Sequence, residues 1–226
     1  MVKYGYYYAG ALVAGALATA YLAGWPYSVP FYIFAAFCLN FFRDPERRAP
    51  QGPVAVSPAD GKVVSVKSSA GGPGQISIFM NVFDVHVNRA PIAGKIACIK
   101  YKKGDFMAAD KEEASEANEQ NIIVIDGMAG DRPTTVVVKQ IAGLIARRII
   151  CYKSSGDPVA LGERIGLIKF GSRVDVLLGP EWDIAVRAGE RVSAGESVVA
   201  RVIDFKGDFK GDFKGDFKGE PQENAA

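Results

Sequence analysis

Four short stretches of the chain gather the side chains that could take part in chemistry. They are rich in polar residues within otherwise apolar surroundings, and they cover residues 42–47 (FRDPER), 57–62 (SPADGK), 79–91 (FMNVFDVHVNRAP) and 166–175 (GLIKFGSRVD). His86 is the single histidine, and imidazole is the side chain that ordinarily exchanges its proton near neutral pH. The hydroxyl of Ser172 is a weak nucleophile unless a base lies beside it. These two residues are therefore a candidate base and a candidate nucleophile.

Each stretch, taken alone, also has a structural interpretation. Asp60 belongs to the sequence SPADG, in which proline and glycine favour an ordinary turn. His86 stands between two valines, a pattern typical of a strand in which histidine is a buried structural residue. The Gly171–Ser172 pair fits a turn or a bulge, and no GxSxG nucleophile elbow surrounds it. The individual residues leave both kinds of role open.

The composition excludes several classes of protein. The chain has 226 residues, with 27 Lys and Arg against 25 Asp and Glu, and a net charge of +2 argues against nucleic-acid binding through bulk charge. A single histidine excludes a histidine-cluster metal site. The three cysteines, Cys38, Cys98 and Cys151, are too widely spaced for a CxxC site, and their odd number argues against a disulfide framework. We expect no metal and a reducing compartment.

The amino-terminal residues predict a membrane-associated helical hairpin over residues 1–42. No charged residue occurs from Tyr4 to Phe42, and Gly24, Pro26 and Pro30 divide this segment into two apolar pieces, about 6–23 and 27–42. Each piece is at the short end of the ~20 residues that span a bilayer, so the hairpin either spans the membrane or dips into one leaflet. A signal peptide and a buried helical pair are the alternatives, although no cleavage site follows.

The basic residues around the hairpin predict its orientation. Lys3 precedes it, while Arg43, Arg47 and Arg48 follow it, and the turn between the two pieces carries no charge. The positive-inside rule then places both ends of the hairpin, and the rest of the chain, on the cytoplasmic face of the cell membrane.

Residues 43–203 predict one mainly β, soluble core, a β-dominated α+β domain. Short β-branched or alternating runs bounded by Gly, Pro or Asp predict strands at 61–66, 75–79, 95–100, 121–125, 134–139 and 174–178. Residues 141–150 fit a strand or a short helix, and 110–120 fit a helix or a loop. Paired Gly-Glu turns within 186–202 are typical of barrel-like modules such as the biotinyl and lipoyl carriers.

Residues 204–226 form a low-complexity tail in which the sequence DFKG occurs four times. A glycine at every fourth position suits neither a helix nor a strand, so we expect a flexible tail. A tail whose Phe and Lys side chains touch anionic lipid is the alternative.

Together, the four polar stretches resemble the phosphatidylserine decarboxylase family in its short bacterial and archaeal form. FFRDPER, SPADGKV, FDVHVNRAP and IKFGSRVD occur in the order and spacing of that family, from residue 42 to about 203. The resemblance implies a pyruvoyl enzyme formed by self-cleavage, in which Ser172 attacks the carbonyl carbon of Gly171 and is converted to the pyruvoyl cofactor. It also implies decarboxylation of phosphatidylserine to phosphatidylethanolamine through a Schiff base.

The resemblance also implies roles for the other polar residues. His86 would be the base and proton donor, Asp60 would orient the base during self-cleavage, and Arg89 or Arg173 would bind the phosphodiester of the substrate. A surface ion pair with a carboxylate such as Asp175 is the alternative for Arg173. The sequence departs from the HxxH pattern of longer family members.

Arg89 occupies the position of the second histidine. Either His86 serves both cleavage and decarboxylation, or Asp60 acts with Arg89 and a water molecule, and we favour His86.

The expected partners follow from this resemblance. They are a phospholipid substrate, the membrane, and the two cleaved chains, residues 1–171 and 172–226, which we expect to stay intertwined. The sequence leaves open whether copies associate into a homo-oligomer. An archaetidylserine decarboxylase with the same head-group chemistry is one alternative function. A non-enzymatic, membrane-tethered lipoyl-like carrier or adaptor is another, although no Met-Lys-Met turn is present.

Overall fold

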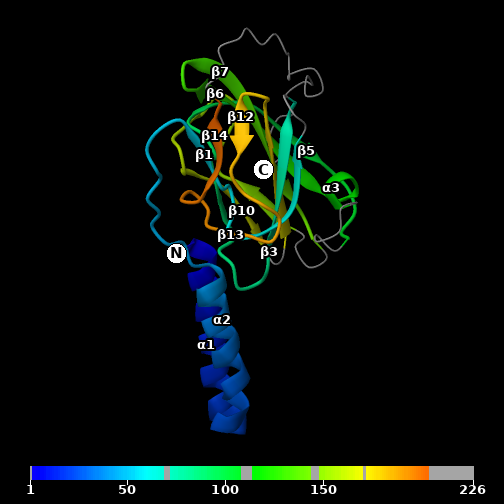
Figure 1. Ribbon diagram of the computed structural model, residues 1–226. Coiled ribbons are helices and arrows are strands. Elements are labelled where there is room, and N and C mark those ends of the chain that lie inside the picture. Colours follow the sequence, from blue (N-terminus) through cyan, green and yellow to red (C-terminus); the bar gives the residue numbers. More distant parts are fainter. Residues whose placement is uncertain (1, 69–71, 108–113, 144–147, 170–171, 204–226) are drawn as a thin grey trace.

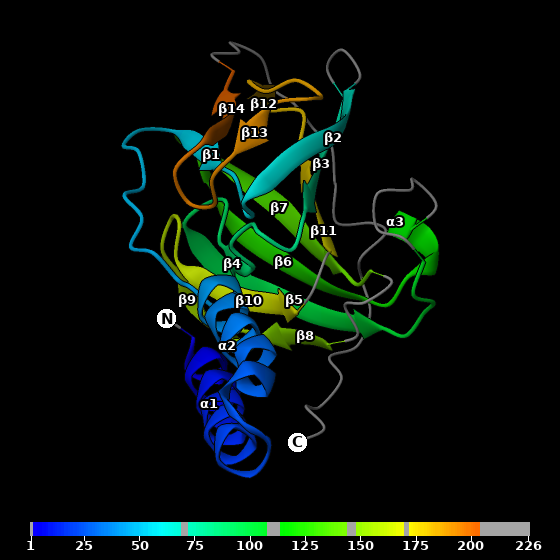
Figure 2. The same cartoon turned by 90° about the horizontal axis from the view of Figure 1, so that it is seen from below.

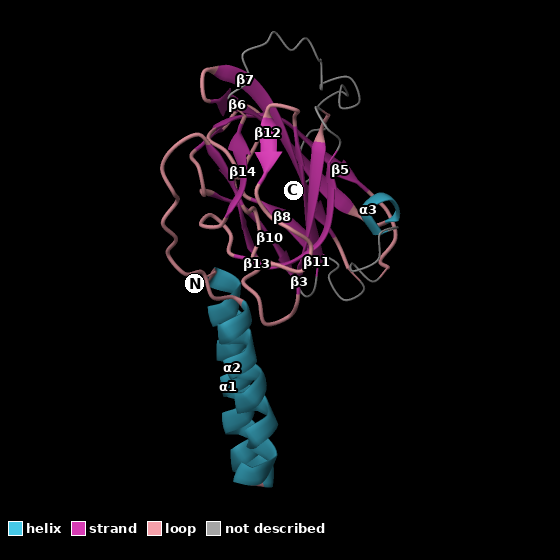
Figure 3. Cartoon of the chain, viewed as in Figure 1, coloured by secondary structure: helices cyan, strands magenta, loops and turns pink. Residues whose placement is uncertain are grey.

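The computed structural model describes residues 2–68, 72–107, 114–143, 148–169 and 172–203 (Figure 1). Gly171 and the repeat tail at 204–226 lie outside the described residues, as does part of the 110–120 segment. The strands form one body, and the helices are confined to an amino-terminal hairpin and the short helix α3 (Ala114–Ala117), as Figure 3 shows. The mainly β fold with a preceding helical hairpin is confirmed.

The helical hairpin projects from the β body as a rod (Figure 1). It consists of α1 (Lys3–Ala23), the short 3-10 helix η1 (Trp25–Ser28) and α2 (Val29–Phe41). Pro26 and Pro30 lie in the first turns of η1 and α2, where a missing backbone N–H costs nothing. Within the described residues, no helix combines the length and the apolar character that crossing a bilayer requires.

An eight-stranded antiparallel sheet forms most of the body. Its strand order is β13-β2-β3-β11-β7-β6-β5-β9, and Figure 2 shows it curving from β2 and β3 towards β5. The strands are β2 (Gly61–Ser68), β3 (Gly74–Met80), β5 (Gly94–Lys102), β6 (Gln120–Ala129), β7 (Arg132–Ile141), β9 (Pro158–Val159), β11 (Ser172–Leu178) and β13 (Arg191–Val192).

Two three-stranded sheets complete the body, with the orders β1-β14-β12 and β4-β10-β8. Their strands are β1 (Val54–Val56), β4 (Val87–Arg89), β8 (Arg148–Cys151), β10 (Arg164–Lys169), β12 (Trp182–Ile184) and β14 (Val198–Val202). The core between the sheets is built almost entirely from Ile, Val, Leu and Ala side chains on the inward faces of the strands.

A separate apolar cluster joins the hairpin to the body. Phe41 and Phe42, at the end of α2, pack with Val85, Val87 and Leu167 of the region around β4 and β10. The backbone N–H of Val2 donates to the carbonyl of Phe42 at 3.0 Å, so both ends of the hairpin meet at this junction. The residues that precede and follow the hairpin are therefore held against the sheet that contains β4 and β10.

The six predicted strands are present, each extended by a few residues. The 141–150 segment divides, since β7 ends at Ile141 and β8 begins at Arg148. His86 differs from its prediction, because it lies just before β4 and outside any strand. The cause is a turn in which the side chain of Asp84 accepts from the N–H of Asn81 and the side chain of Asn81 accepts from the N–H of Phe83.

Candidate active site

Ser172 opens β11 in the middle of the large sheet. It is paired in register with Met80 of β3 and shares its face of the strand with the core residues Val174 and Val176. The side chain is fully buried, and its Oγ makes no hydrogen bond to any described residue. An unpaired buried hydroxyl is destabilising by about 1–3 kcal/mol. This cost is difficult to explain by a structural role and is compatible with a reactive one.

His86 is a buried, neutral imidazole with a fixed orientation. Its Nδ1 lies 2.9 Å from the backbone carbonyl oxygen of Asp84. A carbonyl only accepts, so Nδ1 carries the proton and donates it, which leaves the basic lone pair on Nε2. Burial lowers the pKa of His86 to about 4, against smaller raising effects from Asp84. At neutral pH the ring is therefore in the form that accepts a proton.

Backbone contacts bring the regions of His86 and Ser172 together. The N–H of Ile168 in β10 donates to the carbonyl of His86 at 3.3 Å, and β10 ends at Lys169, three positions before Ser172. On the other side, Nδ2 of Asn88 approaches the sulfur of Met80, the strand partner of Ser172, at 3.7 Å. The segment from His86 to Asn88 thus borders the start of β11.

Asp60 lies at the turn that precedes β2. Its carboxylate accepts hydrogen bonds from Nη2 of Arg47 at 2.8 Å and from the backbone N–H of Ala194 at 2.7 Å. Burial raises the pKa of Asp60, and the bonds from Ala194 and Arg47 oppose this shift. Gly61, with a φ of 149°, is required here because a Cβ would lie 2.2 Å from the carbonyl oxygen of Phe79.

An orienting role for Asp60 stays a prediction, and in the hydrogen bond described above it is the backbone carbonyl of Asp84 that orients the imidazole. The carboxylate of Asp84 also accepts from the N–H of Asn81 at 2.9 Å and forms an ion pair with Arg191. The sequence analysis missed Asp84, although its position two residues before His86 was a usable indication. The charge of Asp84 also acts to raise the pKa of Asp60, so the two carboxylates lie in one region.

The guanidinium of Arg89 is used within the fold. It donates to the carbonyls of Gly162 and Pro45, both at 3.0 Å, and to the carboxylate of Asp44 at 3.1 Å. These contacts fasten the segment after the hairpin to the loop before β10. Burial lowers the pKa of Arg89, with further lowering by the nearby Arg164. A substrate-binding role for Arg89 stays a prediction that these contacts do not favour.

Arg173 is 2% exposed and lies on the face of β11 opposite to Ser172. Its Nε is 2.6 Å from the carboxylate of Asp175, and its Nη2 donates to the hydroxyl of Ser77 at 2.7 Å. The sequence alternative of an ion pair with Asp175 named the right partner, but the pair is in the interior and not at the surface. A role for Arg173 in substrate binding likewise stays a prediction.

A chain of buried amides lies beside the candidate site. Nε2 of Gln140 donates to Oδ1 of Asn88 at 2.8 Å, and Nδ2 of Asn121 donates to Oε1 of Gln140 at 2.9 Å. Gly166 permits this arrangement, because a Cβ there would lie 2.7 Å from Nε2 of Gln140 and 2.5 Å from the carbonyl of Ile150. The sequence analysis missed these amides, which alternate with apolar residues in ordinary strands.

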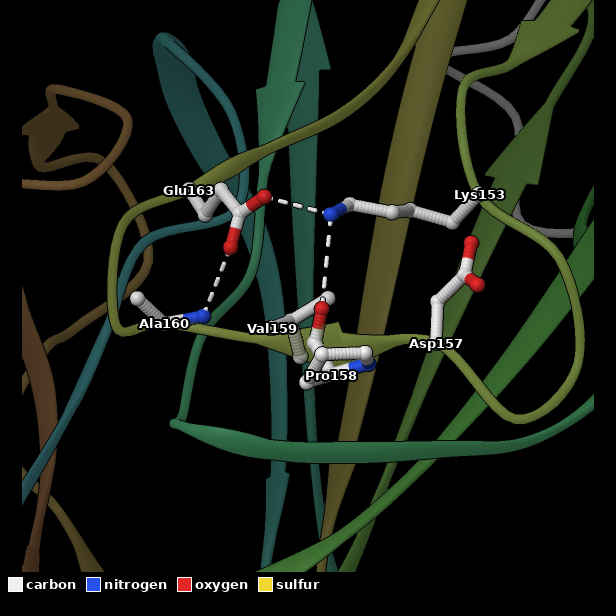
Figure 4. A pocket seen from close by; sticks show the side chains of 6 residues that line it. All are labelled: Lys153, Asp157, Pro158, Val159, Ala160 and Glu163. Atoms are coloured by element: carbon white, nitrogen blue, oxygen red, sulfur yellow. Dashed lines mark hydrogen bonds and ion pairs between the residues drawn. The ribbon is translucent and has the colours of Figure 1, made fainter.

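A surface hollow of about 630 Å³ lies elsewhere, around Lys153 and Glu163 (Figure 4). Its charges are satisfied within it: Lys153 pairs with Glu163, which also accepts from the N–H of Ala160 at 2.8 Å. Asp157 accepts from the N–H of Ser154 at 2.8 Å. The hollow shares no lining residue with the cluster around Ser172 and His86. In the described part of the chain, no group of three His, Cys, Asp or Glu side chains is placed to hold a metal ion.

Comparisons with known proteins identify the family. The family profile described as phosphatidylserine decarboxylase matches residues 34–200. The phosphatidylserine decarboxylase proenzyme of Solibacter usitatus is 62% identical over 206 residues, which cover 91% of this chain and 98% of the relative. The proenzymes of Desulfotalea psychrophila and Magnetococcus marinus are 46% and 42% identical, over 76% and 85% of this chain and 83% and 91% of their own lengths. This chain therefore belongs to the phosphatidylserine decarboxylase family.

Proposed function

We propose that the protein is a phosphatidylserine decarboxylase proenzyme that cleaves itself between Gly171 and Ser172. The observation that carries this proposal is the fully buried Oγ of Ser172, which no described residue satisfies by a hydrogen bond. The names of the relatives, all proenzymes, support it. Gly171 lies outside the described residues, so its role as the residue whose carbonyl is attacked is inferred from the sequence alone.

The residues present fit a pyruvoyl group made from Ser172. The hydroxyl to be consumed has no hydrogen bond to a described residue that it would lose, and Ser172 is fully buried. When formed, the pyruvoyl group supplies a carbonyl that accepts the substrate amine and withdraws electrons as carbon dioxide leaves. The protein supplies binding, orientation and proton transfer.

In the cleavage step, His86 acts as the base. Oγ of Ser172 bonds to the carbonyl carbon of Gly171, its proton passes to the imidazole, and the bond from that carbon to the nitrogen of Ser172 breaks. Elimination then releases residues 1–171 with a free carboxylate, and hydrolysis releases ammonia from residue 172. A neutral imidazole, with its Nδ1 proton held by the carbonyl of Asp84, is the form that this first step needs.

The sheet topology supports a mature enzyme of two associated chains. In the chain of residues 172–226, β11 pairs with both β3 and β7, β13 pairs with β2, and β14 pairs with β1. These neighbours all belong to residues 1–171. Cleavage at residue 171 would therefore leave many interchain backbone hydrogen bonds in place, and the chains would separate only on unfolding.

We further propose that the hairpin inserts into one leaflet of the cell membrane from the cytoplasmic side. Its surface exposes large apolar side chains along its length, including those of Leu17, Leu22, Trp25, Ile33 and Phe34. Exposed apolar area of this extent is typical of an interaction surface. The flanking basic residues favour the cytoplasmic face. A lipid held in that leaflet would present its head group at the base of the hairpin.

A denaturing gel with mass spectrometry tests the cleavage. Wild-type protein should give two chains, and the smaller should be ~17 Da lighter than residues 172–226, because ammonia is lost as the serine becomes a carbonyl group. Ser172→Ala should remain one full-length chain without decarboxylase activity. An active enzyme that stays a single uncleaved chain would refute the proposal.

Flotation with liposomes tests the membrane insertion separately. The full-length protein should float with vesicles, and a protein lacking residues 1–41 should stay in the aqueous fraction. Equal flotation of the two proteins would exclude the hairpin as the anchor while leaving the cleavage proposal intact.

A further inference from the structure

Lys169, at the end of β10, is a buried cation enclosed by aromatic rings. It is 6% exposed, and its Nζ lies 3.9 Å from the centroid of the Tyr4 ring, 5.4 Å from that of Tyr8 and 5.9 Å from that of Phe42. We call Tyr4, Tyr8 and Phe42 the aromatic cage. The hydroxyl of Tyr8 accepts a hydrogen bond from Nζ at 3.3 Å.

The charge of Lys169 has no carboxylate partner among the described residues. The cationic side chains buried in the described part of the chain are those of Arg89, Lys169 and Arg173. Arg89 reaches Asp44 and Arg173 reaches Asp175, whereas Lys169 meets only rings and a phenol. Rings compensate a buried charge only in part. Among the described residues, no anion therefore balances the charge of Lys169.

Tyr8 gives this site a path to the surface. Its side chain is 42% exposed, and its hydroxyl accepts from Lys169, so the hydroxyl proton remains available for donation. An anion beside Tyr8 would receive one hydrogen bond from the phenol and would lie close to the ammonium. Two donors of this kind suit a phosphate oxygen.

The aromatic cage also lies between the hairpin and the candidate active site. Phe42 of the cage contacts Phe41, with their ring centroids 4.9 Å apart. Phe41 in turn contacts His86, with their ring centroids 4.3 Å apart. Lys169 precedes Ser172 by only two intervening residues. An anion held here would sit where the apolar hairpin ends and the catalytic residues begin.

We propose that Lys169 and Tyr8 bind the phosphodiester of the lipid head group. This inference rests on the proposed function, since it assumes that the substrate is a glycerophospholipid. Its acyl chains would extend along the hairpin, and its serine would extend towards Ser172 and His86. The site would select lipids that carry a phosphate, and it would bind the substrate before any chemical step takes place.

Binding to the full-length, uncleaved Ser172→Ala protein tests the site without any requirement for the cofactor. The probe is soluble dihexanoylphosphatidylethanolamine, which contains the phosphodiester, and its dissociation constant is measured from 31P resonance broadening. Adding Lys169→Gln should weaken binding about 10- to 100-fold, and adding Tyr8→Phe should weaken it about 3- to 10-fold, as expected for charge-assisted and neutral hydrogen bonds. Lys169→Arg should restore most of the affinity.

Matched controls separate a binding role from a structural one. Lys153→Gln removes a lysine that pairs with Glu163 and that is not part of the aromatic cage, and it should leave the dissociation constant unchanged. Dihexanoylglycerol, which has no phosphate, should bind the Lys169→Gln and parent proteins equally. Inorganic phosphate should compete only weakly, because a lipid phosphodiester also uses the hairpin.

Several outcomes would overturn the proposal. These are unchanged phosphatidylethanolamine binding in Lys169→Gln, an equal loss of dihexanoylglycerol binding, or no binding by the parent Ser172→Ala protein, in which Lys169 and Tyr8 are already in place. Strong competition by inorganic phosphate would identify a free-phosphate site instead. Because none of these measurements requires cleavage, failure of the proposed function would be seen separately, as a wild-type chain that does not cleave.

Discussion

Lys169 and Arg173 flank the proposed cleavage bond, and both carry a positive charge into the interior. Arg173 lies in a closed network, in which Asp175 receives hydrogen bonds from Gln75 at 3.0 Å and from Ser115 at 2.6 Å in addition to its pair with Arg173. Lys169 lies in an open one, because its neighbours are the rings of the aromatic cage and the hydroxyl of Tyr8, a residue that is 42% exposed. The two positive charges lie only four positions apart, yet one is neutralised by a carboxylate and the other is surrounded by aromatic rings.

This difference in environment indicates which of the two positive charges is available to a ligand. A buried ion pair whose remaining donors and acceptors are satisfied gains nothing from a further anion, and opening it leaves a charge uncompensated. A cation among rings still gains from an anion, since a ring attracts it less strongly than a carboxylate or phosphate does. We therefore favour Lys169 over Arg173 as the residue that binds the substrate.

His86 shows a third way to bury a basic group beside the same bond. Burial lowers its pKa to about 4, so the ring stays neutral and avoids the cost of an interior charge. Arg173 is paired with a carboxylate, Lys169 is enclosed by aromatic rings and His86 is neutral. We therefore expect a different response to mutation or to pH from each of the three residues.

The largest effect is expected at the closed network. Asp175→Asn leaves the guanidinium of Arg173 buried without its counter-charge, so the free energy of unfolding should fall by about 3–5 kcal/mol. Urea denaturation of the uncleaved Ser172→Ala protein measures this, because a single chain allows two-state analysis. Asp183→Asn, at an exposed position of β12, is the control and should change the value by less than about 0.5 kcal/mol. A loss below about 1 kcal/mol for Asp175→Asn would mean that the network is not closed.

The pH dependence of stability comes next in size. The unfolded chain binds a proton at His86 below pH 6.5, whereas the folded chain binds it only below about pH 4. The stabilisation from a neutral His86 is therefore complete above pH 6.5 and is lost as the pH falls towards 4, by about 3 kcal/mol in total. Unfolding free energies of the uncleaved protein and its His86→Gln variant should converge over this range. Parallel curves would show that the pKa of His86 is the same in the folded and unfolded chains.

Much of the fold and part of the site could be predicted from the sequence. Runs rich in β-branched residues and bounded by turn residues identified the central strands, because the alternation of side chains and the positions of turn residues are local properties of the sequence. The residues at Ser172 and His86 were identified by type and by motif. The pair of Arg173 and Asp175 was also accessible, since residues two apart in a strand share a face.

The remainder depended on contacts that span the chain. Lys169 looks like an ordinary strand-end lysine, and nothing local indicates that Tyr4 and Tyr8, more than 160 positions earlier, enclose it. Asp84 reaches His86 through a backbone carbonyl, which carries no residue-specific pattern. The interior location of Arg173 follows from what covers the second face of the sheet, and a strand's own sequence does not determine that.

The smallest effect is expected for Lys169→Met, and the same substitution at Arg173 is its comparison. Arg173→Met strands the carboxylate of Asp175 and should cost about 3–5 kcal/mol of unfolding free energy. Lys169→Met strands no carboxylate, and it replaces the ammonium by an apolar group of similar length while losing cation–π attraction of about 0.5–2 kcal/mol. Relief from burying the charge offsets that loss, so the net change should stay within about 1 kcal/mol. Urea denaturation of both variants in the Ser172→Ala background makes the comparison direct. If Lys169→Met were as destabilising as Arg173→Met, the aromatic cage would be a structural network and the phosphate of the lipid would have to bind elsewhere.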